Sequence, residues 1–179
     1  STDESPLPIE TYEELMSMED GQYYILLNDI VLPNSDTVQA FTPITANVAG
    51  FDGNGYSLLL GGNYTFSGSN IGIFGTIGAS DEDVVVKNLT VELYSNTIFT
   101  VTSGSFTLGL IAGGNNAVIT NCEVTTNNNS ALSVSCSASS SFVAGFVGRN
   151  SGIITNSRSS VSIFTNVNLA GFVGTNSGT

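Results

Sequence analysis

The stretch GFVGRNSGIITN, residues 145–156, decides the fold, because its first eight positions return almost unchanged as GFVGTNSG at residues 171–178. A degenerate copy, GLIAGGNNAVITN, occupies residues 109–121. A weaker copy opens with GIFG at residues 72–75 and closes with VVVKNLTV at residues 84–91. The first glycines of the copies lie 37, 36 and 26 residues apart. A period between about 20 and 50 residues indicates a repeat architecture.

Each copy follows the same plan. An apolar pair follows the first glycine, as at Phe146 and Val147, then comes a turn of small residues, and then a β-branched run with an asparagine. Short β-branched runs bounded by Gly and Asn are typical of strands joined by tight turns, and nothing in the copies recurs at helical spacing. One copy is too small to bury its own apolar face, but stacked copies can do so. We therefore expect an all-β chain in which each copy is one coil of a β-solenoid, with strands of successive coils about 4.8 Å apart.

Stacking places equivalent positions directly above one another. Asn88, Asn121 and Asn156 are equivalent in the three copies that include this position. They are expected at a turn, where their amides form a ladder from coil to coil or to the backbone. Alternatively, Asn is simply tolerated there because it adopts the left-handed backbone conformation readily.

These residues carry a family resemblance. The order GFVG, NSG and then an Ile-x-Asn-Ser segment resembles the GLUG motif of bacterial surface and secreted proteins. FDGNGYS at residues 51–57 and the segments 9–15 and 21–29 resemble the sequence that precedes such repeats. The resemblance implies a right-handed parallel β-helix in a large extracellular protein, often an adhesin, and it supplies no catalytic residues. The first copy departs from the pattern at Ile73, where Leu is usual, and in an acidic insertion at Asp81–Asp83.

Composition excludes several classes of function. Apolar residues make up 41% of the chain and charged residues only 10%, well below the usual quarter, so Ser, Thr and Asn replace charges at the surface. This exchange argues against an ordinary cytosolic enzyme. The net charge is −12, and Lys87, Arg149 and Arg158 are the only cations. Three cations cannot neutralise a run of phosphates, which excludes nucleic acid and anionic lipid as partners.

The chain divides by its composition. Residues 1–48 are interpreted as a lead-in, a short N-terminal capping helix and the first strands, and residues 49–179 as the β-helix coils. Fourteen of the fifteen carboxylates fall within residues 1–92. The stop inside a repeat favours a fragment of a longer chain, or an open last coil that docks onto the next subunit. No apolar run approaches 18 residues, so we expect no membrane insertion.

The N-terminal elements have local signals. Thr11 is the expected N-cap of the capping helix, with Glu13 and Glu14 in its first turn, where the helix dipole favours anions. Strands are expected at residues 23–27, 30–32, 56–60, 90–94 and 97–102. Tight corners are expected at residues 51–55 and 61–62.

Two cysteines, Cys122 and Cys136, lie 14 residues apart. In an extracellular chain an even count favours a disulfide, which would pin two strands of one coil. The alternative is two small residues buried in a tight solenoid.

Few residues suit catalysis or metal binding. Histidine is absent, so a Ser-His-Asp arrangement is excluded, zinc has no ligand set, and no glycine run matches a phosphate-binding loop. Hydrolysis of a sugar needs paired carboxylates, for which Asp29, Asp52 and Asp81–Asp83 are the candidates. The last of these would suit calcium by charge but lacks the spacing of a calcium loop, which favours a solvated acidic turn. We expect no catalytic residues, no metal and no cofactor.

The remaining candidate residues concern N-glycosylation and contact with sugars. Three asparagines match the acceptor pattern for N-glycosylation: Asn63, Asn88 and Asn128. Such matches also arise by chance in a chain this rich in Ser, Thr and Asn. Three tyrosines near expected corners could stack on sugars, although partly buried packing is favoured for them: Tyr56, Tyr64 and Tyr94.

The sequence therefore predicts a structural function outside the cell or on its surface. The leading hypothesis is a rigid stalk or adhesion module of a larger surface protein, with glycans or a host or neighbouring-cell surface as partners. The second hypothesis is a subunit of an extracellular filament that self-associates through the open C-terminal coil at residues 171–179. The third, from the enzyme class, is a fragment that cleaves polysaccharides.

Overall fold

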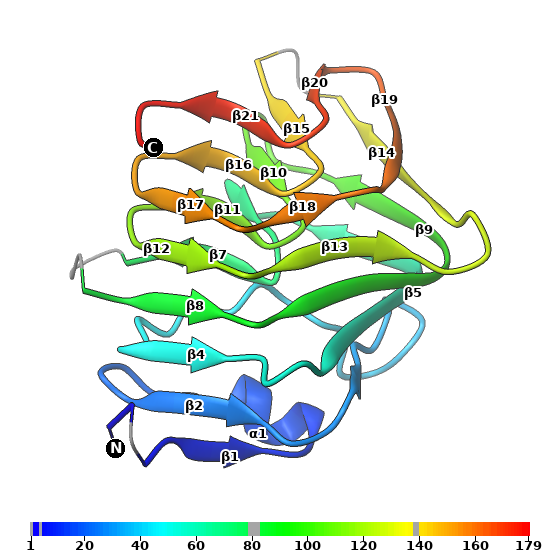
Figure 1. The fold of residues 1–179 in the computed structure, drawn as a ribbon. Coiled ribbons are helices and arrows are strands. Elements are labelled where there is room, and N and C mark those ends of the chain that lie inside the picture. The colour runs from blue at the N-terminus through cyan, green and yellow to red at the C-terminus, as the bar shows by residue number, and fades with distance from the viewer. Residues whose placement is uncertain (1, 4, 79–82, 138–139) are drawn as a thin grey trace.

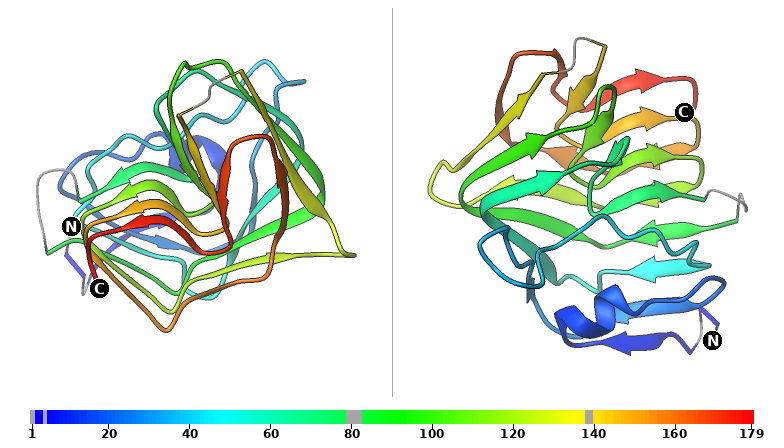
Figure 2. Two further views of the ribbon diagram at one scale, coloured as in Figure 1. Left: turned by 90° about the horizontal axis from the view of Figure 1, so that it is seen from above. Right: turned by 180° about the vertical axis from the view of Figure 1, so that it is seen from behind.

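The chain forms a right-handed parallel β-solenoid that rises from the N-terminus to the C-terminus (Figure 1). The computed structural model describes residues 2–3, 5–78, 83–137 and 140–179. Every pairing between named strands in this part of the chain is parallel. The view down the axis shows the strands of successive coils stacked above one another (Figure 2, left). The predicted all-β solenoid is confirmed.

Four sheets form the walls of the solenoid. The first wall contains β1 (Leu7–Ile9), β2 (Tyr23–Leu26), β4 (Gly50–Asp52), β8 (Val85–Lys87), β12 (Val118–Thr120) and β17 (Ile153–Thr155). The long wall contains β3 (Ile30–Val31), β5 (Ser57–Phe66), β9 (Thr90–Val101), β13 (Glu123–Thr126), β14 (Ala131–Cys136), β18 (Arg158–Ser159) and β19 (Ser162–Thr165).

The two remaining walls are shorter. The third wall contains β6 (Asn70–Ile71), β10 (Thr107–Gly109), β15 (Phe142–Ala144) and β20 (Asn168–Ala170). The fourth contains β7 (Phe74–Ile77), β11 (Ala112–Asn115), β16 (Val147–Asn150) and β21 (Val173–Asn176). Many side-chain contacts between coils join residues 35 apart in sequence.

The core consists of columns of apolar side chains that point inward from alternate strand positions. Val86 and Ile119 are fully buried, and Ile154 lies above them in register. Tyr64 is also buried, and its hydroxyl donates to the Leu32 carbonyl at 2.7 Å and accepts from the Gly61 N–H at 3.2 Å. Burial raises the pKa of the Tyr64 phenol to about 12. The core is therefore apolar except where a polar group has a local partner.

The glycines of the repeated motif lie where the backbones of neighbouring coils meet. A Cβ atom on Gly109 would lie 2.5 Å from the Gly148 nitrogen and from the Val147 Cα atom. On Gly152 it would meet the backbone of Ala117 in the coil below. The motif therefore contains glycine because these positions have no room for a side chain.

We expect Gly109→Ala to lower the free energy of unfolding by about 1–3 kcal/mol, because rigid backbone would have to move to admit the methyl group. Gly104→Ala is the matched control, since nothing lies within 4 Å of a Cβ atom there and its φ is not positive. Urea denaturation followed by circular dichroism measures both. Equal stability of the two variants would contradict this explanation of the motif.

The N-terminal end carries the predicted capping helix, α1 (Tyr12–Met16). Thr11 caps it in a reciprocal capping box with Glu14, and Leu15 is fully buried against the core. Figure 2 (right) shows α1 beside the lowest coils. No helix in the described part of the chain has the length and apolar character needed to cross a membrane.

Three strand boundaries differ from the sequence prediction. The expected corner at residues 51–55 begins as strand β4, because Gly50 and Phe51 pair with Val85 and Val86, and only residues 53–55 turn. The expected corner at residues 61–62 lies inside β5. A register shift there takes up two extra residues of β9, because Leu60 pairs with Leu93 and Gly62 with Thr97. β9 also runs unbroken through residues 90–101. A bulge thus bends the long wall without ending its strands.

Candidate functional site

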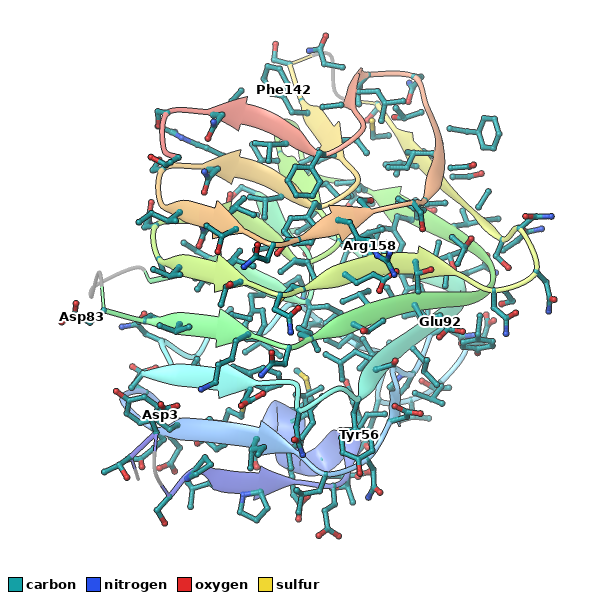
Figure 3. All side chains as sticks on the ribbon, viewed as in Figure 1. Asp3, Tyr56, Asp83, Glu92, Phe142 and Arg158 are labelled. Carbon is teal, nitrogen blue, oxygen red and sulfur yellow. The ribbon has the colours of Figure 1, made fainter. Side chains whose placement is uncertain are left out.

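A polar groove follows the corner between the first wall and the long wall. Its volume is about 590 Å³. Nine residues from successive coils line it: Gly55, Asn88, Thr90, Asn121, Cys122, Glu123, Asn156, Ser157 and Arg158. Figure 3 shows the side chain of Arg158 on the outer surface of this corner. We call this feature the corner groove.

The predicted column of asparagines forms one side of the corner groove. Asn88, Asn121 and Asn156 have φ values of 54°, 53° and 47°, so each turns the chain in the left-handed conformation. The Asn121 amide donates to the Asn88 Oδ1 atom at 2.6 Å, and the Asn88 amide donates to Asp52 Oδ1 at 2.9 Å. Both explanations given for the pattern therefore apply to the lower two residues. For Asn156, the described residues show the conformation but no side-chain bond to Asn121.

The other side of the corner groove carries an ion pair. Arg158 lies 2.9 Å from Glu123, and the two residues are paired in register between β13 and β18. The Arg158 side chain is 75% exposed, and its bond to Glu123 raises the pKa of the guanidinium. The groove thus presents amide, hydroxyl, carboxylate and guanidinium groups in rows along the solenoid axis. Such groups form hydrogen bonds with hydroxyl-rich ligands.

A second asparagine ladder lies inside the solenoid, at the ends of β11, β16 and β21. The Asn115 amide donates to Asn150 Oδ1 and the Asn150 amide donates to Asn176 Oδ1, both at 2.8 Å. Asn115 and Asn150 are each only 1% exposed. Sequence reasoning interpreted these positions as turns and missed the ladder. The signal was present, because the same residue recurs at the same place in three copies.

We expect Asn150→Ala to reduce the free energy of unfolding by about 1–3 kcal/mol, because the buried Asn115 amide loses an acceptor and the part-buried Gly152 carbonyl loses a donor. Asn127→Ala is the control, since Asn127 is exposed in a loop, and a change within about 0.5 kcal/mol is expected there. Chemical denaturation of both variants decides the matter. An Asn150 variant as stable as the control would show that the ladder contributes nothing.

The carboxylates that were candidates for catalysis stabilise turns. Asp52 accepts from the Asn54 N–H at 2.8 Å and lies 3.7 Å from Lys87, which also contacts Asp3 at 3.1 Å. Asp29 accepts from the Ser57 N–H at 2.7 Å. Of the acidic insertion, residues 81 and 82 lie outside the described residues, and only Asp83 can be placed, on the surface. Both Asp29 and Asp52 therefore have a clear structural role.

The asparagines of the glycosylation pattern differ in their surroundings. Asn63 and Asn128 are exposed, on β5 and in the loop after β13 respectively. The Asn88 side chain is held in the bonds to Asn121 and Asp52. An attached glycan would break those bonds, so Asn63 and Asn128 are the more accessible positions.

The three tyrosines also differ in their exposure. Tyr64 is buried in the core and cannot meet a sugar, whereas Tyr94 is 41% exposed and Tyr56 is partly exposed. The packing expected for Tyr64 is confirmed. None of the three lines the corner groove.

The expected disulfide is not present, since Cys122 and Cys136 are not bonded to one another. Cys122 is buried at the corner, and its neighbour Glu123 pairs with the first residue of β9. Cys136 pairs with Val101, the last residue of that twelve-residue strand. A disulfide needs Cα atoms within about 7 Å, and the length of β9 separates the two. Burial raises the pKa of the Cys122 thiol to about 11. The alternative of packed small residues applies to Cys122.

Comparisons with models of known families, with curated proteins and with solved structures found no match. Among the residues that the structure describes, no group of three or more Cys, Asp or Glu side chains is placed to hold a metal ion. The solenoid and its surfaces are therefore the features from which a function can be inferred.

Proposed function

We propose that this chain is a structural β-solenoid of the GLUG-repeat type that works outside the cell or on its surface, as a rigid stalk or adhesion module. The observation that carries the proposal is the continuous alignment of polar rows on successive coils. Thr155 donates to Thr120 at 2.9 Å, and the corner asparagines and the Glu123–Arg158 pair follow the same register. A parallel ladder of this kind resists extension, and each coil displays its polar side chains at a fixed height.

The corner groove is the surface we assign to adhesion, with glycans as its ligands. Its amide, hydroxyl and ionic groups match the donors and acceptors of a sugar chain. Asn121, Asn156 and Arg158 are the most accessible of these side chains, since all three are exposed. The low fraction of charged residues and the abundance of Ser, Thr and Asn support a surface that contacts neutral glycans.

A glycan array probed with the 179-residue chain tests adhesion. We expect binding that weakens about tenfold in Arg158→Ala, because one or two hydrogen bonds to a charged group are lost. Arg149→Ala is the matched control, since Arg149 is an exposed cation on the fourth wall. Equal losses in both variants would indicate non-specific charge attraction, and no binding by the parent chain would leave the stalk without an adhesive role.

A filament subunit is the second candidate, because the last coil exposes columns that are buried one coil below. Val143 is fully buried, whereas Leu169, its partner in register, is 50% exposed. The opposite end argues against head-to-tail stacking. The Ile9 carbonyl of β1 accepts a hydrogen bond from the Leu27 N–H, just after β2, so the backbone groups of Pro8 face outward. Proline has no N–H to donate to a neighbour there.

Light scattering and electron microscopy at rising concentration separate the two candidates. We expect the parent chain to remain monodisperse, and Pro8→Val to associate more readily, because it restores an outward N–H at the edge of β1. If the parent chain formed fibres with an axial repeat equal to the height of these coils, the filament hypothesis would be supported and the stalk hypothesis rejected.

A further inference from the structure

A second groove lies on the other side of the molecule, where the lowest coil departs from the wall. In that coil the chain follows β5 only as far as Asn34 and Ser35, and then returns to pair Ile44 with Phe74. The departing segment, residues 33–48, is drawn in light blue to cyan in Figure 2 (right). No strand lies beneath β6 in the described chain, so the third wall ends there. One rung of the solenoid is missing.

A cavity of about 580 Å³ occupies the place of that rung, a size that suits a bound ligand. One wall is the continuous segment 65–70 together with Gly75 and Thr76, and the loop 42–46 forms another. Leu15, Met16 and Met18, from α1 and the residues after it, close the remaining side. We call this cavity the rung groove.

The backbone that borders the rung groove points hydrogen-bonding groups into it. The carbonyls of Phe66 and Ser69 accept bonds from Thr102 and Thr107, in the coil above. Because successive residues of a strand direct these groups to opposite sides, the N–H and carbonyl of Asn70 face the groove. Asn70 is exposed, and its side chain is held by Thr76 and Thr107 at 3.0 Å each. This is an unpaired strand edge held in a fixed position.

Apolar side chains supply a complementary surface. The core column Leu108–Ile71 ends at Ile71, the lowest residue of the third wall. Three partly exposed apolar residues line the rung groove: Met16, Pro43 and Ala46. An added strand would therefore place an apolar side chain against these residues while its backbone pairs with Asn70.

We propose that the rung groove binds an extended segment of another polypeptide, which adds as a parallel strand beneath β6 and inserts one apolar side chain. This activity goes beyond a stalk or an adhesin. Strand addition gains affinity from main-chain hydrogen bonds and specificity from the pockets for alternate side chains. Among the described residues no charged side chain lines the groove, but Glu14 and Glu19 adjoin the lining residues Leu15 and Met18 in sequence, and the whole chain has a net charge of −12. The surrounding field therefore favours a basic segment.

Selection from a phage library of random dodecapeptides on the 179-residue chain tests this proposal. We expect enriched peptides that alternate apolar and polar residues and carry net positive charge. Gly75→Val fills the groove, because a Cβ atom there meets Asn70, Ile44 and Pro43 at ordinary contact distances of 3.6–3.8 Å. It should weaken binding of the selected peptides about tenfold or more, with Gly104→Val as the matched control.

Two further measurements keep the outcome decisive. Thermal unfolding must show that Gly75→Val is folded, and N-methylation of alternate amides in a selected peptide should weaken it about tenfold if the main chain pairs with β6. Failure to enrich any peptide would overturn the proposal. Peptides that bind the Gly75→Val variant as tightly as the parent chain would also overturn the proposal, and would indicate that they bind the open last coil instead. A dimer of the parent chain that is lost in Gly75→Val would also overturn the proposal, because the occupant would then be a second copy of the chain.

Discussion

The close approach of backbone to backbone between coils is the constraint on which the rest of the structure depends. At Gly109 and Gly152 the neighbouring coil occupies the space that a side chain would need. Hydrogen bonds between parallel strands keep this spacing constant, so equivalent positions of paired strands lie directly above one another. The buried apolar columns, the two asparagine ladders and the rows of hydroxyl groups all follow from that one register.

The sequence revealed most of this arrangement, because repeated glycines report the points of close approach directly. The corner asparagines were predicted in the same way, from one residue type at the end of three apolar runs. The internal ladder of Asn115, Asn150 and Asn176 was missed, because an asparagine beside Ser or Gly has the same signature in a turn as in a ladder. The prediction of a disulfide was wrong, because the number of residues between two cysteines does not show how far apart a long strand holds them.

The rung groove depends on a feature that sequence patterns do not encode. Its existence follows from the point at which the lowest coil leaves the wall, near Asn34, and from the path that returns to Ile44. A turn in the sequence predicts a change of direction but not its destination. The functions we propose for this solenoid therefore use both the regular surface, which repeats predict, and the departure from regularity, which only the structure reveals.

The internal asparagine ladder also protects the chain against chemical ageing. Asparagine is a labile residue, and it deamidates when the N–H nitrogen of the next residue attacks its side-chain amide. The N–H groups after all three asparagines are engaged: Asn116 donates to Ile77, Ser151 to Asn115 and Ser177 to Asn150. The fold thus restrains both the nucleophile and the amide at each rung. Durability of this kind is valuable to a protein that is not replaced quickly.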